Sequence, residues 1–175
     1  MQSEGVHIHE STTKIGPISL AMFQNRLCWI DFGSWTETRT IFEKWTGKAG
    51  LPDSWLRDDA AFTAIDQQID DYLAGKRHSF DCPILLIGTE FQKKVWRALE
   101  TIPYGETRTY SDIAAQIGKP GASRAVGGAN NKNPLPLIIP CHRVIGKDGT
   151  LTGYGGGLEI KQALLEIETQ DLTLC

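Results

Sequence analysis

The sequence has few cysteines, no closely spaced pair of them and no long apolar run. Its 175 residues contain four cysteines, spread widely along the chain and without a CxxC pair. Neither a disulfide scaffold nor a cysteine-rich zinc site is therefore indicated. No apolar stretch approaches the roughly 18 residues that a membrane-spanning helix requires. The opening Met-Gln-Ser-Glu lacks the charged and apolar regions of a secretion signal, so a reducing cytoplasm is expected.

A strong net charge is also absent, but the charge is unevenly distributed. The chain carries a net charge of −3, which gives no bulk affinity for nucleic acid. Residues 1–88 contain 8 Lys/Arg and 12 Asp/Glu, whereas residues 89–175 contain 10 and 9. Between Lys119 and Lys147 there are five basic residues and no acidic one. Such a stretch can mark contact with nucleic acid, although it also occurs by chance in surface loops.

The first half of the chain predicts strands and one helix. A hydrophobic fraction of 41% is ordinary for a globular protein, and the length allows one domain or two small ones. Apolar runs at 18–23 and 27–32 flank the turn residues 24–26, which predicts a β-hairpin. Apolar residues at helical spacing predict a helix from Asp59 to Ala74. We expect a small α+β unit here, with no pattern that indicates chemistry.

The second half predicts mostly helices. Thr89 is a candidate N-cap for a helix that ends near Pro103. Helices from about Tyr110 to Ile117 and from Ala122 to Asn130, joined by a short turn with glycine, form a helix-turn-helix pattern. A hairpin of helices used only for packing is the alternative interpretation. A last helix is predicted from Glu159 to Glu168.

These elements give the predicted fold class, which is α+β. We predict a small N-terminal α+β domain over residues 1–88. A mostly helical, winged-helix-like domain with the helix-turn-helix and the candidate active-site cysteine follows over residues 89–175.

The candidate for chemistry is Cys141. The apolar run 137–139 predicts a strand that delivers this cysteine to a partly enclosed site, and Pro140 stiffens the approach. A thiol is a nucleophile only as the thiolate, so it needs a base or a positive field. His142 is the neighbouring base, and Arg143 adds positive charge. A lone cysteine such as Cys141 is more often an inert buried thiol, and a lone histidine such as His142 can be purely structural.

Several segments together resemble one protein family. The motif Pro-Cys-His-Arg-Val at 140–144 resembles the active-site signature of the O6-alkylguanine-DNA alkyltransferases. Further similar segments, in matching order and spacing, are Arg-Ala-Val-Gly-Gly-Ala at 124–129, Asn-Pro at 133–134, Thr-Gly-Tyr at 152–154, Gly-Gly-Leu at 156–158 and Leu-Leu at 164–165 followed by Glu168. The resemblance covers roughly Thr89 to Glu168 and extends more weakly over the N-terminal part.

The resemblance implies direct DNA repair. An alkyl group, typically methyl, would move from O6 of a flipped guanine in duplex DNA to Cys141, once per molecule; O4 of thymine is left open as a second substrate. His142 would deprotonate the thiol through a water, and Glu168 would orient His142. Asn133 would hold the active-site turn. Tyr110 would help to rotate the nucleotide and would donate a proton to the departing guanine.

The resemblance also implies which residues touch DNA and which line the pocket. Arg124 would enter the base stack and fill the gap left by the guanine. The other DNA-contacting residues would be Tyr110, Ser111, Lys119 and Lys147. The substrate pocket would include Pro136, Val144, Tyr154 and Gly155. At Gly155 some family members carry a serine, so a side-chain contact is missing here.

No metal and no organic cofactor are implied, because the cysteine itself accepts the alkyl group. His7, His9 and Cys28 do not match the zinc ligands of some animal members. The expected partner is double-stranded DNA that contains O6-alkylguanine, and the expected state is a monomer, with clustering on DNA left open. In a prokaryote the location would be the cytoplasm, at the nucleoid when bound.

Three other functions compete with this interpretation. A non-catalytic protein that binds alkylated DNA would have the same fold but would lack the acceptor cysteine, which is present here. A Cys-His hydrolase would need an oxyanion hole and would leave the helix-turn-helix unexplained. A transcription factor would leave the cysteine motif unexplained.

Overall fold

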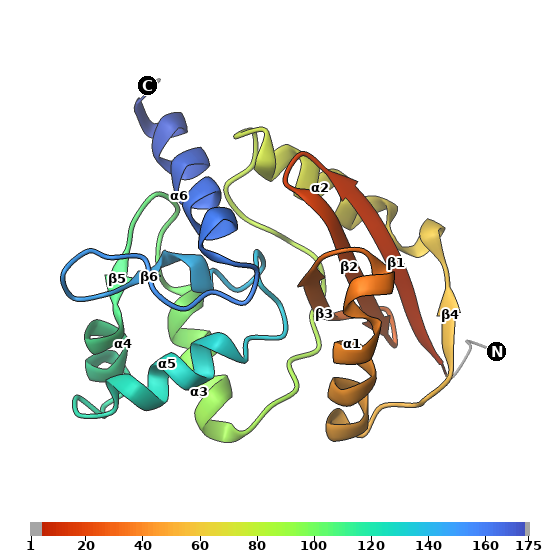
Figure 1. Cartoon of the computed structure of the whole chain (residues 1–175), viewed down its shortest axis with the longest axis horizontal. Helices are drawn as coiled ribbons and strands as arrows, with labels where there is room; N and C mark the ends of the chain where they lie inside the picture. Colours follow the sequence, from red (N-terminus) through yellow and green to blue (C-terminus); the bar gives the residue numbers. More distant parts are fainter. Residues whose placement is uncertain (1–4, 174–175) are drawn as a thin grey trace.

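Four strands in the first half of the chain form one sheet. The computed structural model describes residues 5–173 and is shown in Figure 1. The strand order is β3-β2-β1-β4, antiparallel except for the parallel pair of β1 and β4. The four strands are β1 (Val6–Thr13), β2 (Gly16–Phe23), β3 (Arg26–Phe32) and β4 (Trp55–Arg57). Two helices, α1 (Trp35–Ala49) and α2 (Thr63–Leu73), pack against this sheet.

The predicted hairpin is confirmed as β2 and β3. Gln24 and Asn25 both adopt positive φ, 52° and 60°, as a two-residue type I′ turn requires. The predicted helix from Asp59 to Ala74 is confirmed as a short 3₁₀ turn followed by α2. Strand β1 and helix α1 were not predicted. Helix α1 does carry sequence signals, since Ser34 and Glu37 form a capping box and Gly50 ends the helix at φ 68°.

Four helices dominate the second half of the chain, as predicted. They are α3 (Glu90–Glu100), α4 (Tyr110–Gln116), α5 (Ser123–Asn131) and α6 (Leu158–Thr173). A small parallel pair, β5 (Arg108–Thr109) and β6 (Val144–Ile145), lies beside them. The predicted α+β fold class is confirmed. The division at residues 88 and 89 and the assignment of α4 and α5 as a helix-turn-helix stay predictions.

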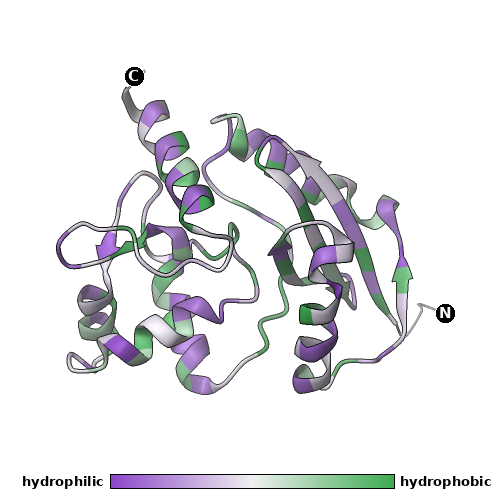
Figure 2. Cartoon of the chain, in the orientation of Figure 1, coloured by the Kyte–Doolittle hydropathy of each residue, from purple (hydrophilic) through white to green (hydrophobic). Residues whose placement is uncertain are grey.

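One apolar core runs through both halves of the molecule. It joins Leu20 and Ile69 of the sheet part to Leu99, Leu135 and many other residues of the helical part. Figure 2 shows apolar residues interspersed with polar ones along the strands and helices. No helix in the described part of the chain is long and apolar enough to cross a membrane.

The two halves also share backbone hydrogen bonds along β3. Leu27 N–H donates to Pro83 O and Ile30 N–H donates to Pro134 O, at 2.9 and 2.8 Å. A free strand edge would expose unpaired amide groups. These bonds cover the edge of β3 and bring the segment around Pro134 against the sheet.

The capping box of α3 allows a test of the fold. Thr89 accepts from Gln92 N–H at 3.1 Å, and the Gln92 side chain accepts from Thr89 N–H at 2.9 Å. We expect Thr89→Ala to lower the free energy of unfolding by about 1 kcal/mol, because one helix N–H loses its partner. Urea unfolding followed by circular dichroism measures this change. Thr107→Ala, at an exposed loop position, is the control; an equal loss in both variants would contradict the role of the cap.

Candidate active site

Cys141 lies at the end of a turn, and the predicted strand at 137–139 is wrong. The run forms a turn in which Leu137 adopts φ 74°. Asn133 holds this turn: its Nδ2 donates to Ile139 O at 2.9 Å, and its Oδ1 accepts from Leu135 N–H at 3.0 Å. Prolines 134, 136 and 140 lack the N–H that a strand ladder needs, which is why the apolar run does not form a strand. The role of Asn133 in the transfer reaction stays a prediction.

The thiol of Cys141 is almost completely buried. Only 3% of the residue is exposed. Burial raises the pKa of the thiol to about 11, although a hydrogen bond with Asn133 and the charge of Lys161 act in the opposite direction. At pH 7 a thiol with this pKa is ionised in only about one molecule in 10⁴. A reaction through sulfur at this site therefore needs a base.

His142 is placed to be that base. It is fully buried, and its Nε2 lies 2.8 Å from Glu168 Oε1. Its Nδ1 is buried without a hydrogen-bond partner among the described residues. Burial lowers the pKa of His142, and the Glu168 carboxylate opposes this effect. A neutral imidazole with a proton on Nε2 leaves a lone pair on Nδ1, which can accept a proton.

Glu168 is a buried carboxylate with several donors. Arg143 donates from Nε and Nη2 at distances of 2.8 to 3.1 Å, and Gly105 N–H donates to Oε2 at 3.1 Å. The Tyr72 hydroxyl donates to Oε1 at 2.6 Å. Burial acts to raise the pKa of Glu168, but the hydrogen bonds from His142 and Arg143 prevail and hold this pKa well below its usual range. The carboxylate is therefore ionised and acts only as an acceptor.

Three side chains near the site were missed or misread from the sequence. Tyr72 was predicted only as part of an apolar helix face. Arg143 was predicted to favour the thiolate, but its guanidinium is turned to Glu168 and to Ile102 O at 2.7 Å. The charge that favours the thiolate comes instead from Lys161, which is fully buried. The polar residues Lys161 and Glu168, seven apart on the buried face of α6, were an available signal.

Lys161 also fixes the backbone around the predicted pocket. Its Nζ donates to Val144 O at 2.5 Å and to Thr152 O at 2.9 Å. Burial lowers the pKa of this amine, and Cys141 opposes that effect. Val144, three residues after Cys141, and Pro136, five residues before it, are both buried. The amine therefore ties the segment after the cysteine to the loop that contains Tyr154.

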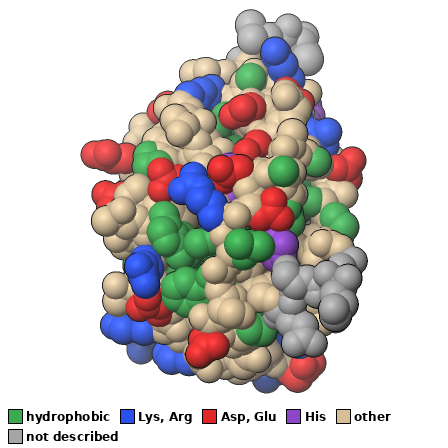
Figure 3. Space-filling model, turned by 90° about the vertical axis from the view of Figure 1, so that its right-hand side faces the viewer, with side chains coloured by type: hydrophobic (Ala, Val, Ile, Leu, Met, Phe, Trp, Pro, Cys, Tyr) green, Lys and Arg blue, Asp and Glu red, His purple; other side chains and the backbone are tan. Residues whose placement is uncertain are grey.

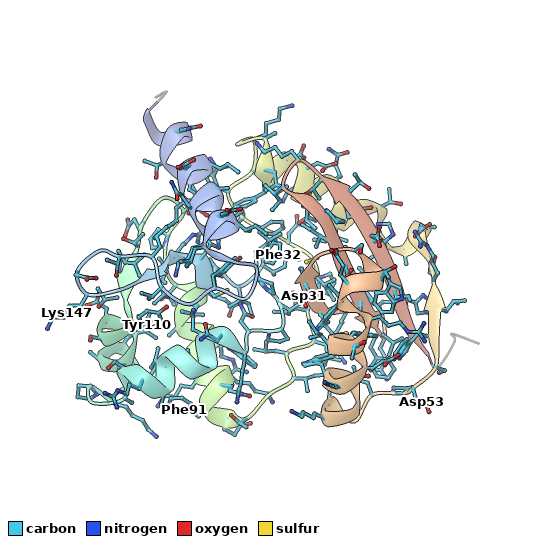
Figure 4. All side chains as sticks on the ribbon, in the orientation of Figure 1. Asp31, Phe32, Asp53, Phe91, Tyr110 and Lys147 are labelled. Atoms are coloured by element: carbon cyan, nitrogen blue, oxygen red, sulfur yellow. The ribbon has the colours of Figure 1, made fainter. Side chains whose placement is uncertain are left out.

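The glycine-rich loop at 153–157 packs against Phe32 of strand β3. The rings of Phe32 and Tyr154 lie 5.7 Å apart, and Figure 4 shows Phe32 at the junction of the two halves. A Cβ at Gly156 would come within 2.5 Å of the Phe32 ring, so only glycine fits there. A Cβ at Gly155 would meet nothing within 4 Å, and its φ is not positive. A side chain at position 155 would therefore fit without backbone strain.

The predicted DNA-contacting residues are separate from this buried cluster. Ser111, Lys119, Arg124 and Lys147 are all exposed, and Tyr110 begins α4. Tyr110 donates from its hydroxyl to Thr152 O at 3.1 Å. Figure 4 shows Tyr110 and Lys147 on the same side of the molecule, beside α4 and β5. The opposite side, seen in Figure 3, instead mixes acidic, basic and apolar side chains.

His7, His9 and Cys28, which were compared with zinc ligands, each make a hydrogen bond to another group. His7 Nδ1 is 2.7 Å from Asp58, and His9 lies 2.7 Å from both Asp59 and Asp66. Cys28 donates its thiol to Ala21 O. Within residues 5–173, no group of three or more His, Cys, Asp or Glu side chains is arranged to hold a metal ion. The fourth cysteine, Cys175, lies outside the described residues.

Two family models match the chain, one on each half. Residues 9–86 match the 6-O-methylguanine DNA methyltransferase, ribonuclease-like domain, and residues 90–170 match the 6-O-methylguanine DNA methyltransferase, DNA binding domain. The methylated-DNA–protein-cysteine methyltransferase of Methanosarcina acetivorans is 50% identical over 154 residues, which are 88% of this chain and 92% of that protein. That of Mycobacterium tuberculosis is 56% identical over 124 residues, 69% of this chain and 75% of that protein.

Solved structures show the same similarity over almost the whole chain. Mycobacterium tuberculosis OGT in complex with DNA has a TM-score of 0.81 and 45% identity, and the match covers 96% of this chain and 98% of that one. The O6-methylguanine-DNA methyltransferase of Pyrococcus kodakaraensis has a TM-score of 0.66 and 28% identity, over 93% and 98% of the two chains.

The charge of Lys161 predicts how the Cys141 thiol ionises. We expect Lys161→Met to move this ionisation to higher pH, because the thiolate loses a nearby positive charge while burial is unchanged. The measurement is the rate at which a small alkylating reagent modifies Cys141 as a function of pH, read by mass spectrometry of its peptide. Lys94→Met, on the exposed face of α3, is the control. If the modification rate of Cys141 has the same pH midpoint in wild type, Lys161→Met and Lys94→Met, the role of Lys161 is refuted.

Proposed function

We infer the function of this chain from its family: it belongs to the 6-O-methylguanine DNA methyltransferase family, whose two domain models match most of its length. It binds DNA and repairs alkylated DNA directly, by transferring the alkyl group to a cysteine of its own chain. We propose that Cys141 is this acceptor. The proposal rests on the position of Cys141, which is buried and directly precedes His142. The Nε2 of His142 is hydrogen-bonded to Glu168, and its Nδ1 has no hydrogen-bond partner among the described residues.

The first step is removal of the thiol proton. His142 accepts it on Nδ1 through an intervening water and becomes an imidazolium. Glu168 stabilises that charge through the bond to Nε2, and it stays ionised because Arg143 is paired with it. Lys161 stabilises the thiolate that remains.

The second step is attack of the thiolate on the alkyl carbon. A sulfur–carbon bond forms as the bond from that carbon to O6 of guanine breaks, and the departing guanine takes a proton from Tyr110. The product is a thioether, which water does not cleave at neutral pH, so each molecule reacts once. No cofactor enters this scheme, because sulfur itself is the acceptor.

The target base has to leave the duplex before it can reach a buried sulfur. Extrusion costs about a few kcal/mol of lost stacking. We propose that Arg124, exposed near the start of α5, occupies the vacated stack and offsets part of this cost. Ser111, Lys119 and Lys147 would bind phosphates, and binding should therefore weaken as salt rises. This assignment treats α4 and α5 as a helix-turn-helix.

The pocket for the extruded base would lie between the segment 136–144 and the loop 153–157. Its predicted members Pro136, Val144 and Tyr154 lie on those two segments, which Lys161 joins. The open space at Gly155 would leave room for alkyl groups larger than methyl.

Several further properties belong to the same proposal. The two family models leave 87–89 between them, which supports a boundary of domains at residues 88 and 89. A monomer would suffice for a transfer that ends on its own cysteine. A protein that acts on chromosomal DNA in a prokaryote would work in the cytoplasm. A non-catalytic role in lesion binding is not favoured, since the relatives are named as methyltransferases.

Substitution of the acceptor gives the first test. Wild-type protein mixed with duplex DNA that contains O6-methylguanine should gain the mass of one CH₂ group, located on Cys141 by peptide mass spectrometry. Cys141→Ala should gain nothing but should bind the same DNA with unchanged affinity, because the exposed contacts are separate from the thiol. Cys82→Ala is the control and should react normally. Methyl transfer that persists in Cys141→Ala would disprove the proposal.

Substitution of Arg124 tests base extrusion. Arg124→Ala should slow repair of duplex DNA about tenfold or more, because the unstacked site is left empty. It should scarcely change reaction with free O6-benzylguanine, which needs no extrusion. Both are measured as single-turnover rates, with Arg97→Ala on the exposed face of α3 as the control. Equal slowing on both substrates would exclude the role in the base stack.

A further inference from the structure

Tyr72 belongs to the sheet part and reaches the His142–Glu168 pair. It lies near the end of α2, is fully buried, and packs edge-on to the ring of His142. Its hydroxyl is 2.6 Å from Glu168 Oε1 and 3.1 Å from His142 Nε2. With the 2.8 Å separation of His142 Nε2 and Glu168 Oε1, these three atoms form a closed triangle.

The protons in this triangle can be assigned from the chemistry of its members. Glu168 is ionised and can only accept, so the single hydroxyl proton of Tyr72 is directed to Oε1. The lone pairs of the Tyr72 oxygen are then turned toward His142. Both neighbours of Nε2 are therefore acceptors, and Nε2 has to carry a hydrogen. The neutral imidazole consequently keeps its lone pair on Nδ1.

We propose that Tyr72 is a positioning residue for the transfer reaction: its hydroxyl, supplied by the sheet part, holds Glu168 and the Nε2–H of His142 so that Nδ1 stays free to take the thiol proton. This inference rests on the proposed function. It assigns to the N-terminal half a supporting role in the reaction, although no motif in that half indicates chemistry.

The surrounding charges are consistent with this role. Arg143 also donates to Glu168, and the Tyr104 ring packs edge-on to the Tyr72 ring. The charge of Lys161 acts to lower the pKa of His142, and the pKa of Tyr154 is raised by burial and by Cys141, Tyr72 and Glu168. Burial and the Glu168 charge raise the pKa of Tyr72, so its hydroxyl stays protonated throughout the working range. Tyr72 is therefore a constant donor and does not titrate itself.

The experiment compares wild type with Tyr72→Phe, which removes only the hydroxyl. Single-turnover rates of methyl transfer to duplex DNA are measured from about pH 6.5 to about pH 9.5. At neutral pH we expect the variant to be about five- to tenfold slower, the effect of one lost hydrogen bond at a site of this kind. The ratio of the wild-type rate to the variant rate should fall steadily toward pH 9.5, because a growing fraction of the Cys141 thiol then ionises without help from His142. Binding of the DNA should not change.

A matched control separates positioning from packing. Thr38→Val removes another buried hydroxyl of the sheet part, one that donates to Ser19 and lies outside the triangle. It should lower the melting temperature but leave the pH profile as in wild type. The double variant Tyr72→Phe with Glu168→Gln should be scarcely slower than Glu168→Gln alone, because Tyr72 acts through Glu168.

A measurement on unmodified protein covers the case in which Tyr72→Phe does not fold. The ¹⁵N chemical shifts of the His142 ring should report a proton on Nε2 and none on Nδ1. The opposite tautomer in wild type would overturn the proposal, as would an unchanged rate or an equal slowing at every pH in folded Tyr72→Phe. Failure of the proposed function is distinct, since wild type itself would then transfer nothing to Cys141.

Discussion

The carboxylate of Glu168 carries its charge at a position with no exposure to water, held by donors from three separate parts of the chain. Tyr72 comes from α2, the Gly105 amide from the loop before β5, and His142 with Arg143 from the turn after Cys141. Removing one partner from a buried charge pair typically costs about 3–5 kcal/mol, because the remaining charge is left uncompensated. The packing of α6 and the orientation of His142 both depend on this one group.

Strand β3 contacts the two segments of the second half that surround Cys141 and Tyr154. Pro134, next to Asn133, accepts a hydrogen bond from Ile30 of β3. Phe32 of the same strand packs against Tyr154 and leaves space only for glycine at position 156. The sheet therefore supports both the turn before Cys141 and the glycine-rich loop at 153–157.

The structure separates reactivity from recognition. Cys141, His142, Glu168 and Lys161 are buried, where a low dielectric strengthens each interaction and keeps the thiol protonated at rest. The cations at 119, 124 and 147 are exposed and lie outside that cluster. A sulfur kept neutral until a base assists it is protected from general alkylating agents and oxidants, which suits an acceptor that can be used once.

The sequence by itself determined the elements with local causes. The β2–β3 hairpin follows from Gln24 and Asn25, and α3 follows from its capping box at Thr89. The Cys141 motif and the segments around it identified the family, and with it the chemistry and most of the candidate residues. Such features depend on short-range sterics and hydrogen bonds, or on residues that stay together along the chain.

The tertiary structure alone decided what depends on residues far apart in the chain. Tyr72 and Glu168 are 96 positions apart, and nothing local to either predicts their 2.6 Å contact. Arg143 was predicted to favour the thiolate because it is close to Cys141 in the sequence. In the folded chain its guanidinium is bound to Glu168, and the charge of Lys161 favours the thiolate instead. In each case the partner of a buried polar group is selected by the fold, since such a group must be satisfied wherever the chain brings a partner to it.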